Sequence, residues 1–263
     1  MFESLVYCIL KFGHVDVIVF IIMGILFHRS DDYETAACFV CFVMIFNQLL
    51  KDLFKVPLFP HLGSSYAFPS GHMHAAMAFY GYIFARTKNI FAKAALVMLL
   101  GSIGFALVYC NFHDWIDVLG AVGFGITEIC IYLFVRRRVS EKIIAGLVLG
   151  LSLLIMLMMC HYAGAIKSHV WLAMYTLVSI IVCKKLWGGI TLPDLKCKLL
   201  STVLIFASIY VIHKLGGFVF SRYQELYLQQ LKFLFFPVAV LFPMFMVKNI
   251  IVTAQKLQKT RKA

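Results

Sequence analysis

Long apolar stretches separated by short polar connections follow one another along nearly the whole chain. A helix needs about 20 apolar residues to cross a hydrocarbon core of about 30 Å, because each residue advances the helix by about 1.5 Å. The expected fold is therefore all-α, a polytopic bundle of membrane helices, and residues 2–12 fit a separate interfacial helix. The stretches near the required length predict nine spans, approximately at residues 14–28, 35–54, 70–86, 92–111, 115–135, 143–160, 169–186, 199–220 and 232–250.

The composition agrees with a membrane environment. Hydrophobic residues make up 62% of the chain and charged residues only 14%, and the mean hydropathy is +0.92, so polar surface is too scarce for a water-soluble domain. The net charge of +12 is expected to anchor the chain to anionic lipid rather than to nucleic acid, because it concentrates in loops and a terminal tail. The eight cysteines lie mostly in apolar stretches, so we expect neither disulfides nor a metal site.

Basic residues separate the two sides of the membrane. Alternate connections carry most of the 24 Lys and Arg residues, among them Arg86, Arg136–Arg138 and the C-terminal tail. Short cytoplasmic loops accumulate such charges, so this side and the C-terminus are expected in the cytoplasm. The connections 55–69 and 111–114 fall on the other side, which predicts that they face the periplasm of a bacterial inner membrane or the lumen of an ER-type membrane.

The segment at residues 136–142 separates helices that carry recognisable motifs from helices that carry none, and so divides the chain into two parts. Residues 1–140 contain all the recognisable chemistry and are expected to form the catalytic membrane core. Residues 141–263 are expected to form a helical extension with four further spans.

The segment Phe68–His72 marks the start of a predicted helix and carries candidate chemistry. Ser70 stands where an N-cap is expected, so its hydroxyl and the first free backbone N–H groups converge on one spot that attracts an anion. Gly71 leaves room for close approach, and His72 projects from the first turn beside the anion, for which phosphate is the natural choice. The alternative is a plain helix start followed by an interfacial histidine.

A second candidate lies at the start of the helix expected at residues 115–135. His113 and Asp117 are four residues apart and share a helix face, so the carboxylate can bind one ring nitrogen and leave the other as a nucleophile. The alternative is a purely structural pair. Lys51 and Lys55, one turn apart at the outer end of an earlier helix, offer point charges for phosphate. The alternative for both lysines is snorkelling to the membrane interface.

Taken together, these residues resemble the type 2 phosphatidic acid phosphatase (PAP2) superfamily over roughly residues 35–137. The resemblance implies a reaction on a lipid phosphate that needs no metal or other cofactor. In this reaction His113 attacks phosphorus and forms a phosphohistidine, while Asp117 orients and charge-stabilises the attacking ring. The likeness rests on four pieces of sequence: Lys51, Phe68–His72, Val108–His113 and Asp117–Gly120.

The resemblance also implies roles for the other matching residues. His72 protonates the leaving group as a general acid, and Lys51, Ser70 and Gly71 hold the phosphoryl oxygens. Water or another acceptor alcohol then releases the phosphate. The implied partners are a lipid phosphate or phospholipid and the bilayer itself, with no nucleic acid.

Four positions depart from the family pattern, and one of them is Phe59, which stands in place of a proline. Leu58 and Leu107 stand where the superfamily carries phosphate-clamping arginines, and Ala106 stands in place of a serine. Each clamp makes charge-assisted hydrogen bonds worth about 2 to 3 kcal/mol in the transition state. Losing two of them slows the reaction by about 10³- to 10⁴-fold unless other groups replace them.

Three accounts of the chain remain open. In the first, Lys55, His61 or His74 supplies substitute donors, and the protein is a lipid phosphate phosphatase or phosphotransferase. In the second, it transfers a phosphodiester head group, as the sphingomyelin-synthase-like branch does, and the single charge of that group needs fewer cations. In the third, the site is catalytically degenerate and the fold binds lipid or acts as a scaffold. The intact pair of histidines and the carboxylate favour an enzyme.

One further ionisable residue lies deep inside a predicted span. Glu128 falls within residues 115–135, where a charged group is costly and a functional role is the default interpretation. The alternative is a protonated carboxyl that hydrogen-bonds to a neighbouring helix.

Overall fold

Helices are the only regular elements in the described part of the chain. The computed structural model describes residues 2–13, 30–163 and 166–187, with single positions after residue 199. This confirms an all-helical integral membrane protein. Four helices within the described ranges are long and apolar enough to cross a membrane: Ala36–Phe54, Ile90–Tyr109, Trp115–Arg136 and Lys142–Tyr162.

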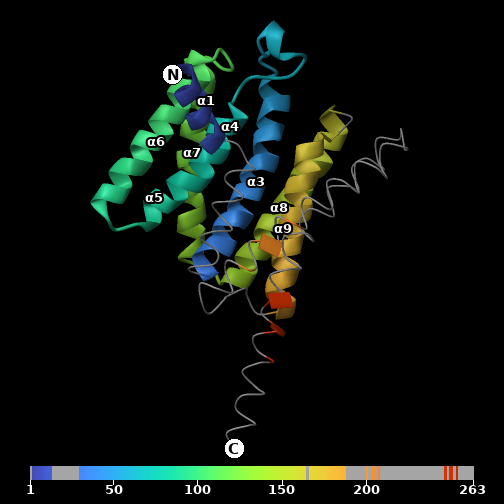
Figure 1. The fold of residues 1–263 in the computed structure, drawn as a ribbon. Helices are drawn as coiled ribbons and strands as arrows, with labels where there is room; N and C mark the ends of the chain where they lie inside the picture. The colour runs from blue at the N-terminus through green and yellow to red at the C-terminus, as the bar shows by residue number, and fades with distance from the viewer. Residues whose placement is uncertain are drawn as a thin grey trace, which may run out of the picture. The chain divides into compact units, whose positions relative to one another are not determined.

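The helices follow the predicted spans where both can be compared. The span expected at 14–28, and nearly all of those at 199–220 and 232–250, lie outside the described residues. The elements in chain order are α1 Phe2–Gly13, α3 Ser30–Phe54, η1 Pro60–Leu62, α4 Gly71–Ala76, η2 Met77–Gly81, α5 Tyr82–Arg86, α6 Ile90–Tyr109, α7 Trp115–Arg136, α8 Glu141–Ala163 and α9 Ser168–Trp187 (Figure 1).

The chain divides into two compact units. The first comprises Met1–Ile21 and Ala36–Val170, and the second comprises Ile22–Thr35 and Trp171–Ala263. The division expected at residue 140 differs from this one, because α8 belongs to the first unit. Only residues 137–140 connect α7 to α8, and so short a connection makes the two helices antiparallel neighbours. The candidate site residues named above all lie in the first unit.

The helix expected at residues 70–86 is one helical run with a wider turn in its middle. α4 and α5 flank the π-helical turn η2, and every residue from Met73 to Tyr82 is buried. Glycine lets α7 approach this run closely, since a Cβ added at Gly125 would lie 2.7 Å from Met77 Cβ. The run is an internal element of the first unit, in contact with α1, α6 and α7.

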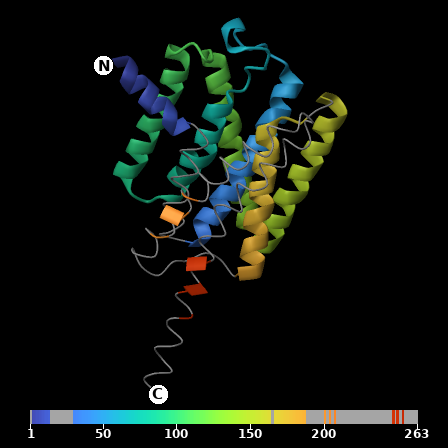
Figure 2. The ribbon, with the colours of Figure 1, turned by 45° about the vertical axis from the view of Figure 1, so that its right-hand side comes forward.

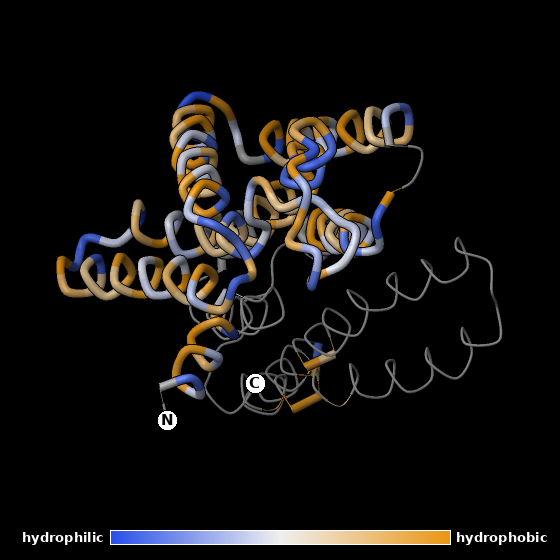
Figure 3. The backbone as a smooth tube through the Cα atoms, turned by 90° about the horizontal axis from the view of Figure 1, so that it is seen from above, coloured by the Kyte–Doolittle hydropathy of each residue, from blue (hydrophilic) through white to orange (hydrophobic). Residues whose placement is uncertain are grey.

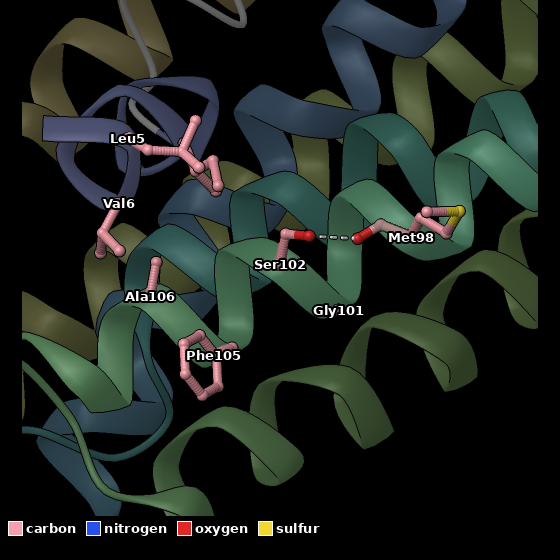
Figure 4. A pocket seen from close by; sticks show the side chains of 8 residues that line it. Leu5, Val6, Met98, Gly101, Ser102, Phe105 and Ala106 are labelled. Carbon is pink, nitrogen blue, oxygen red and sulfur yellow. Dashed lines mark hydrogen bonds between the residues drawn. The ribbon is translucent and has the colours of Figure 1, made fainter. Parts of the chain in front are cut away.

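α1 packs against α6 and α4, so the separate helix expected at residues 2–12 is present. Val6 and Leu10 are buried. The Tyr80 hydroxyl donates to Phe12 O at 3.0 Å and ties the end of α1 to η2. Between α1 and α6 lies an apolar groove of about 330 Å³ (Figure 4). Its lining carries no ionisable side chain, so the candidate chemistry lies elsewhere.

Both motif-bearing connections lie at the same end of the first unit. The α3–α4 loop and the α6–α7 turn share one end in two views, whereas the α5–α6 and α7–α8 connections lie at the other (Figures 1 and 2). Hydrophobic residues run along the helices, and hydrophilic residues gather at helix ends and connections (Figure 3). Arg86, Lys88 and Arg136–Arg138 therefore lie at the end opposite the motifs.

Candidate active site

The two sequence motifs meet at the start of α4. Ser70 caps this helix as expected, and its side chain accepts a long hydrogen bond from Met73 N at 3.5 Å. The Ser70 backbone N–H donates to Asp117 O at 3.1 Å. Because Asp117 lies in the first turn of α7, this bond fixes the start of α4 against the start of α7. Ser70 has no exposed surface, so in this structure it supports the turn rather than facing solvent.

The ring of Phe68 packs directly on α7. A Cβ added at Gly120 would lie 2.2 Å from Phe68 Cε2, so the contact requires glycine at this position. Phe54 meets the same ring edge-on, with ring centroids 4.9 Å apart. This aromatic packing adds to the Ser70–Asp117 bond in holding the first motif on α7.

Replacing Gly120 with alanine is expected to destabilise the protein by about 1 to 3 kcal/mol, because the added methyl group forces the Phe68 ring to move. Gly123→Ala is the matched control, since nothing lies within 4 Å of a Cβ added at Gly123. That variant should be neutral or slightly more stable than wild type. Thermal unfolding in detergent micelles, followed by circular dichroism, compares the two variants. Equal melting temperatures would contradict the tight contact at Gly120.

His113 and Asp117 form the expected pair. His113 Nδ1 and Asp117 Oδ2 lie 3.0 Å apart, and the two residues are 7% and 3% exposed. Asp114 begins α7 through a capping box, in which Asp117 N donates to Asp114 Oδ1 at 2.8 Å and Asp114 N donates to Asp117 Oδ2 at 3.4 Å. The backbone N–H of His113 donates to Leu107 O at 3.3 Å. The pair is therefore held between the end of α6 and the start of α7.

This arrangement determines which ring nitrogen of His113 is available. The Asp117 carboxylate accepts the hydrogen bond, so Nδ1 carries the proton and Nε2 keeps its lone pair. Burial lowers the pKa of His113, the hydrogen bond with Asp117 opposes that shift, and the charge of Lys51 lowers the pKa further. The net lowering keeps the ring neutral near pH 7, which is the nucleophilic form.

Lys51 binds the loop that leads into α4. Its Nζ donates to Tyr66 O at 2.6 Å and to Ala67 O at 3.0 Å. An ammonium group has three donors, so one N–H remains for another acceptor. The Lys51 charge acts on His113 and interacts with Asp117. Lys51 thus fixes the loop, rather than snorkelling freely, and adds positive charge near the His113 ring.

His74 points into the bundle instead of towards this site. The residue is fully buried, with Nδ1 3.0 Å from Asn47 Nδ2 and Nε2 3.0 Å from Glu128 Oε2. Because both ring nitrogens are occupied within the bundle, the structure does not bring His74 to the His113–Asp117 pair, and Lys55 and His61 are the other candidates of the first account. The turn of α4 directs residue 74 towards α3 and α7, whereas His72 is exposed. For Glu128, the hydrogen bond to a neighbouring helix is the arrangement observed.

The other substitute donors lie on exposed parts of the α3–α4 loop. Lys55 is exposed and follows α3 directly with φ of 53°. His61 is exposed in η1 and stacks on Phe59, with ring centroids 5.9 Å apart. Neither side chain hydrogen-bonds to the His113–Asp117 pair within the described ranges.

Leu58 and Leu107, at the two positions where the PAP2 resemblance leads us to expect arginine, lie in the α3–α4 loop and in α6. Leu107 and Ala106 are 2% and 1% exposed near the end of α6, and Leu58 donates its N–H to Ser65 O at 2.9 Å in the loop. In the residues that the structure describes, no group of three His, Cys, Asp or Glu side chains could hold a metal ion. Among the described residues, Lys51 supplies positive charge near His113.

Asn47 is a site residue that the sequence pattern did not indicate. Its Nδ2 donates to Pro69 O at 3.3 Å, and its Oδ1 would lie 3.2 Å from a Cβ added at Gly71. Asn47 thus supports the chain on both sides of Ser70. Asn47 could have been found from the sequence because it is an amide inside an apolar stretch, one helical turn before Lys51. An unpaired polar group is unfavourable there, so such a residue is expected to have a hydrogen-bond partner.

Comparisons with known proteins give no match: no protein-family model, curated protein or solved structure matches this chain. The class of protein is therefore defined by the fold and the site, as a helical membrane protein with a buried His–Asp pair at one end of its bundle. The chemical groups at that end are a neutral imidazole, a second histidine in the first turn of α4, and lysine ammonium groups.

Proposed function

We propose that this protein is a membrane lipid phosphate phosphatase or phosphotransferase with a PAP2-like core, which reacts through a phosphohistidine at His113. The observation that carries the proposal is the buried His113–Asp117 pair, with 3.0 Å between Nδ1 and Oδ2. A neutral imidazole oriented by a carboxylate is a nucleophile. Lys51 supports the proposal because it supplies positive charge beside this ring.

The proposed reaction has two steps. In the first, Nε2 of His113 attacks phosphorus, the bond from phosphorus to the leaving oxygen breaks, and His72 transfers a proton to that oxygen. The carboxylate of Asp117 stabilises the positive ring that results. In the second, water attacks the phosphohistidine and gives a proton to His72, and the P–N bond breaks to release phosphate. An acceptor alcohol in place of water completes a transfer reaction.

The depth of the site supports a lipid substrate. His113 follows α6 closely, and Asp117 lies in the first turn of α7, and both helices are long and apolar enough to span a membrane. The reacting groups therefore lie at the edge of the apolar slab, where a lipid presents its phosphate without leaving the bilayer. We assign this face to the periplasm or lumen and the C-terminus to the cytoplasm, because the basic connections lie at the opposite end.

Head-group transfer is the second candidate, and the missing guanidinium groups favour it. Leu107 is buried, and a phosphodiester carries one negative charge where a monoester carries nearly two. A substrate with less charge needs fewer cations around phosphorus. The attack by His113 is the same in both candidates, and only the substrate and the acceptor differ.

Incubating the purified full-length protein in mixed micelles with lipid monoesters, pyrophosphates and diesters tests the proposal. We expect turnover that persists in EDTA, because neither step uses a metal ion. Free phosphate from a monoester or pyrophosphate identifies a phosphatase, and exchange of head groups without free phosphate identifies a transferase. Absence of both for every lipid would overturn the proposed catalysis and favour a lipid-binding or scaffold role.

A further inference from the structure

Two lysine ammonium groups bind neighbouring residues of the segment that leads into α4. Lys51 Nζ, from the end of α3, donates to Tyr66 O at 2.6 Å. Lys167 Nζ, from the connection between α8 and α9, donates to Ser65 Oγ at 3.1 Å. Adjacent Cα atoms are about 3.8 Å apart, so both ammonium groups are brought to one short stretch of backbone.

Antiparallel backbone contacts hold that stretch in place. Leu58 N donates to Ser65 O at 2.9 Å, and Ala67 N donates to Val56 O at 2.8 Å. We call residues 56–58 together with 65–67 the loop clasp. The loop clasp is followed directly by the start of α4, which is hydrogen-bonded to Asp117 in α7 through the Ser70 backbone N–H. The two lysines therefore approach a structured part of the candidate site.

The charges of Asp117 and Asp52 act on Lys51 without forming an ion pair with it. Across the described ranges, neither Lys51 nor Lys167 forms an ion pair with Asp or Glu, and Asp117 is bonded to His113. The two ammonium charges are close enough to repel each other. The charges of both lysines also act on His169 at the start of α9. Like charges gathered in this way attract an anion.

We propose that Lys167 is a second phosphate-binding cation of the site, acting together with Lys51. This inference rests on the proposed function and deepens it, because the ligand class is a doubly charged phosphate monoester, either free or on a lipid. On binding, the Lys167 ammonium exchanges its bond to Ser65 for one to a phosphoryl oxygen. The chain after residue 141 then takes part in the site together with residues 1–140.

Full-length Lys167→Ala tests this inference, with Lys88→Ala as the charge-matched control. Lys88 is exposed in the connection between α5 and α6, at the opposite end of the first unit. We expect Lys167→Ala to raise both the inhibition constant of inorganic phosphate and the KM for a lipid monoester by about tenfold to a hundredfold, as for the loss of one charge-assisted hydrogen bond. Lys167→Arg should restore most of the affinity, and Lys88→Ala should match wild type.

Equilibrium dialysis of radiolabelled inorganic phosphate distinguishes failure of this inference from failure of the proposed catalysis. Weaker phosphate binding by Lys167→Ala, without lipid turnover by any form, supports the cation site while the catalysis fails. Lipid turnover with unchanged phosphate affinity and KM in Lys167→Ala overturns the role of Lys167 and leaves the catalysis standing. Weaker phosphate binding with an unchanged KM supports the cation with free phosphate as its ligand. No phosphate binding by wild type overturns the inference.

Discussion

Replacing His113 with glutamine is expected to abolish phosphoryl transfer while the bundle stays folded. Glutamine keeps a polar group within reach of Asp117 but offers no nucleophilic nitrogen, so kcat should fall by at least about 10⁴-fold. The initial rate on the lipid with the fastest turnover measures the effect. His161→Gln is the matched control, because His161 is an exposed histidine in the last turn of α8, and its rate should equal that of wild type.

Trapping of radiolabel on the protein provides the second readout of the same experiment. A phosphohistidine contains a P–N bond, so the label should be lost in acid and retained in base. It should be present on wild type and on His161→Gln, and absent from His113→Gln. A rate for His113→Gln close to that of wild type would exclude His113 as the nucleophile, and so would label retained by that variant.

The same assay across pH tests the protonation state of the ring. Burial and the Lys51 charge lower the pKa of His113 from its ordinary 6.5, so the ring should still be neutral and nucleophilic at pH 6.5. As the pH is lowered, kcat/KM should therefore stay constant down to 6.5 and decline only at lower pH. The Asp117 interactions raise that pKa, so the decline in Asp117→Asn should move to lower pH still. Measuring both proteins on one substrate removes the contribution of substrate ionisation. A decline that moved to higher pH would contradict the pairing of His113 with Asp117.

The helices best predicted from the sequence are those with uninterrupted apolar stretches, and their exact ends depend on capping residues. The stretch at residues 92–111 corresponds to α6, yet Asn89 Oδ1 accepts from Phe91 N and Ala92 N and starts the helix earlier. Asn111, with φ of 53°, lies beyond the other end, where the helix has already stopped. Hydropathy locates a span because burial in lipid dominates its energy, whereas one hydrogen bond at a cap decides where it begins.

The local part of the site was predictable, and the contacts between helices were not. The spacing of His113 and Asp117 specifies their hydrogen bond, because both lie at the same helix start. The partner of His74 lies on a different helix, so the contact with Glu128 depends on how α4 packs against α7. Lys167 lies in a connection without recognisable chemistry, and only the path of the α3–α4 loop brings Ser65 to it.

Breaking the contact between His74 and Glu128 is expected to cause a large loss of stability. Asn47 Nδ2 donates to Pro69 O, which turns the amide nitrogen towards His74 Nδ1, so Nδ1 accepts and Nε2 carries the proton donated to Glu128. Glu128→Leu strands that Nε2–H in a fully buried ring. The free energy of unfolding should fall by about 2 to 4 kcal/mol, because water does not reach the ring to replace the lost partner.

Thermal unfolding in micelles measures this loss, which corresponds to a fall in melting temperature of about 5 to 15 °C. Thr127→Leu is the matched control, because Thr127 is exposed and its hydroxyl bonds to Gly123 O within α7, so its effect should stay within about 0.5 kcal/mol.

The His74→Leu, Glu128→Leu double variant should lose less stability than the sum of the single variants, since the second substitution removes the group that the first one stranded. Strictly additive losses would show that the two side chains do not stabilise each other. Asn47 contacts both His74 and Pro69, the residue before Ser70. The buried contact between His74 and Glu128 therefore also supports the start of α4, on which the proposed phosphate chemistry depends.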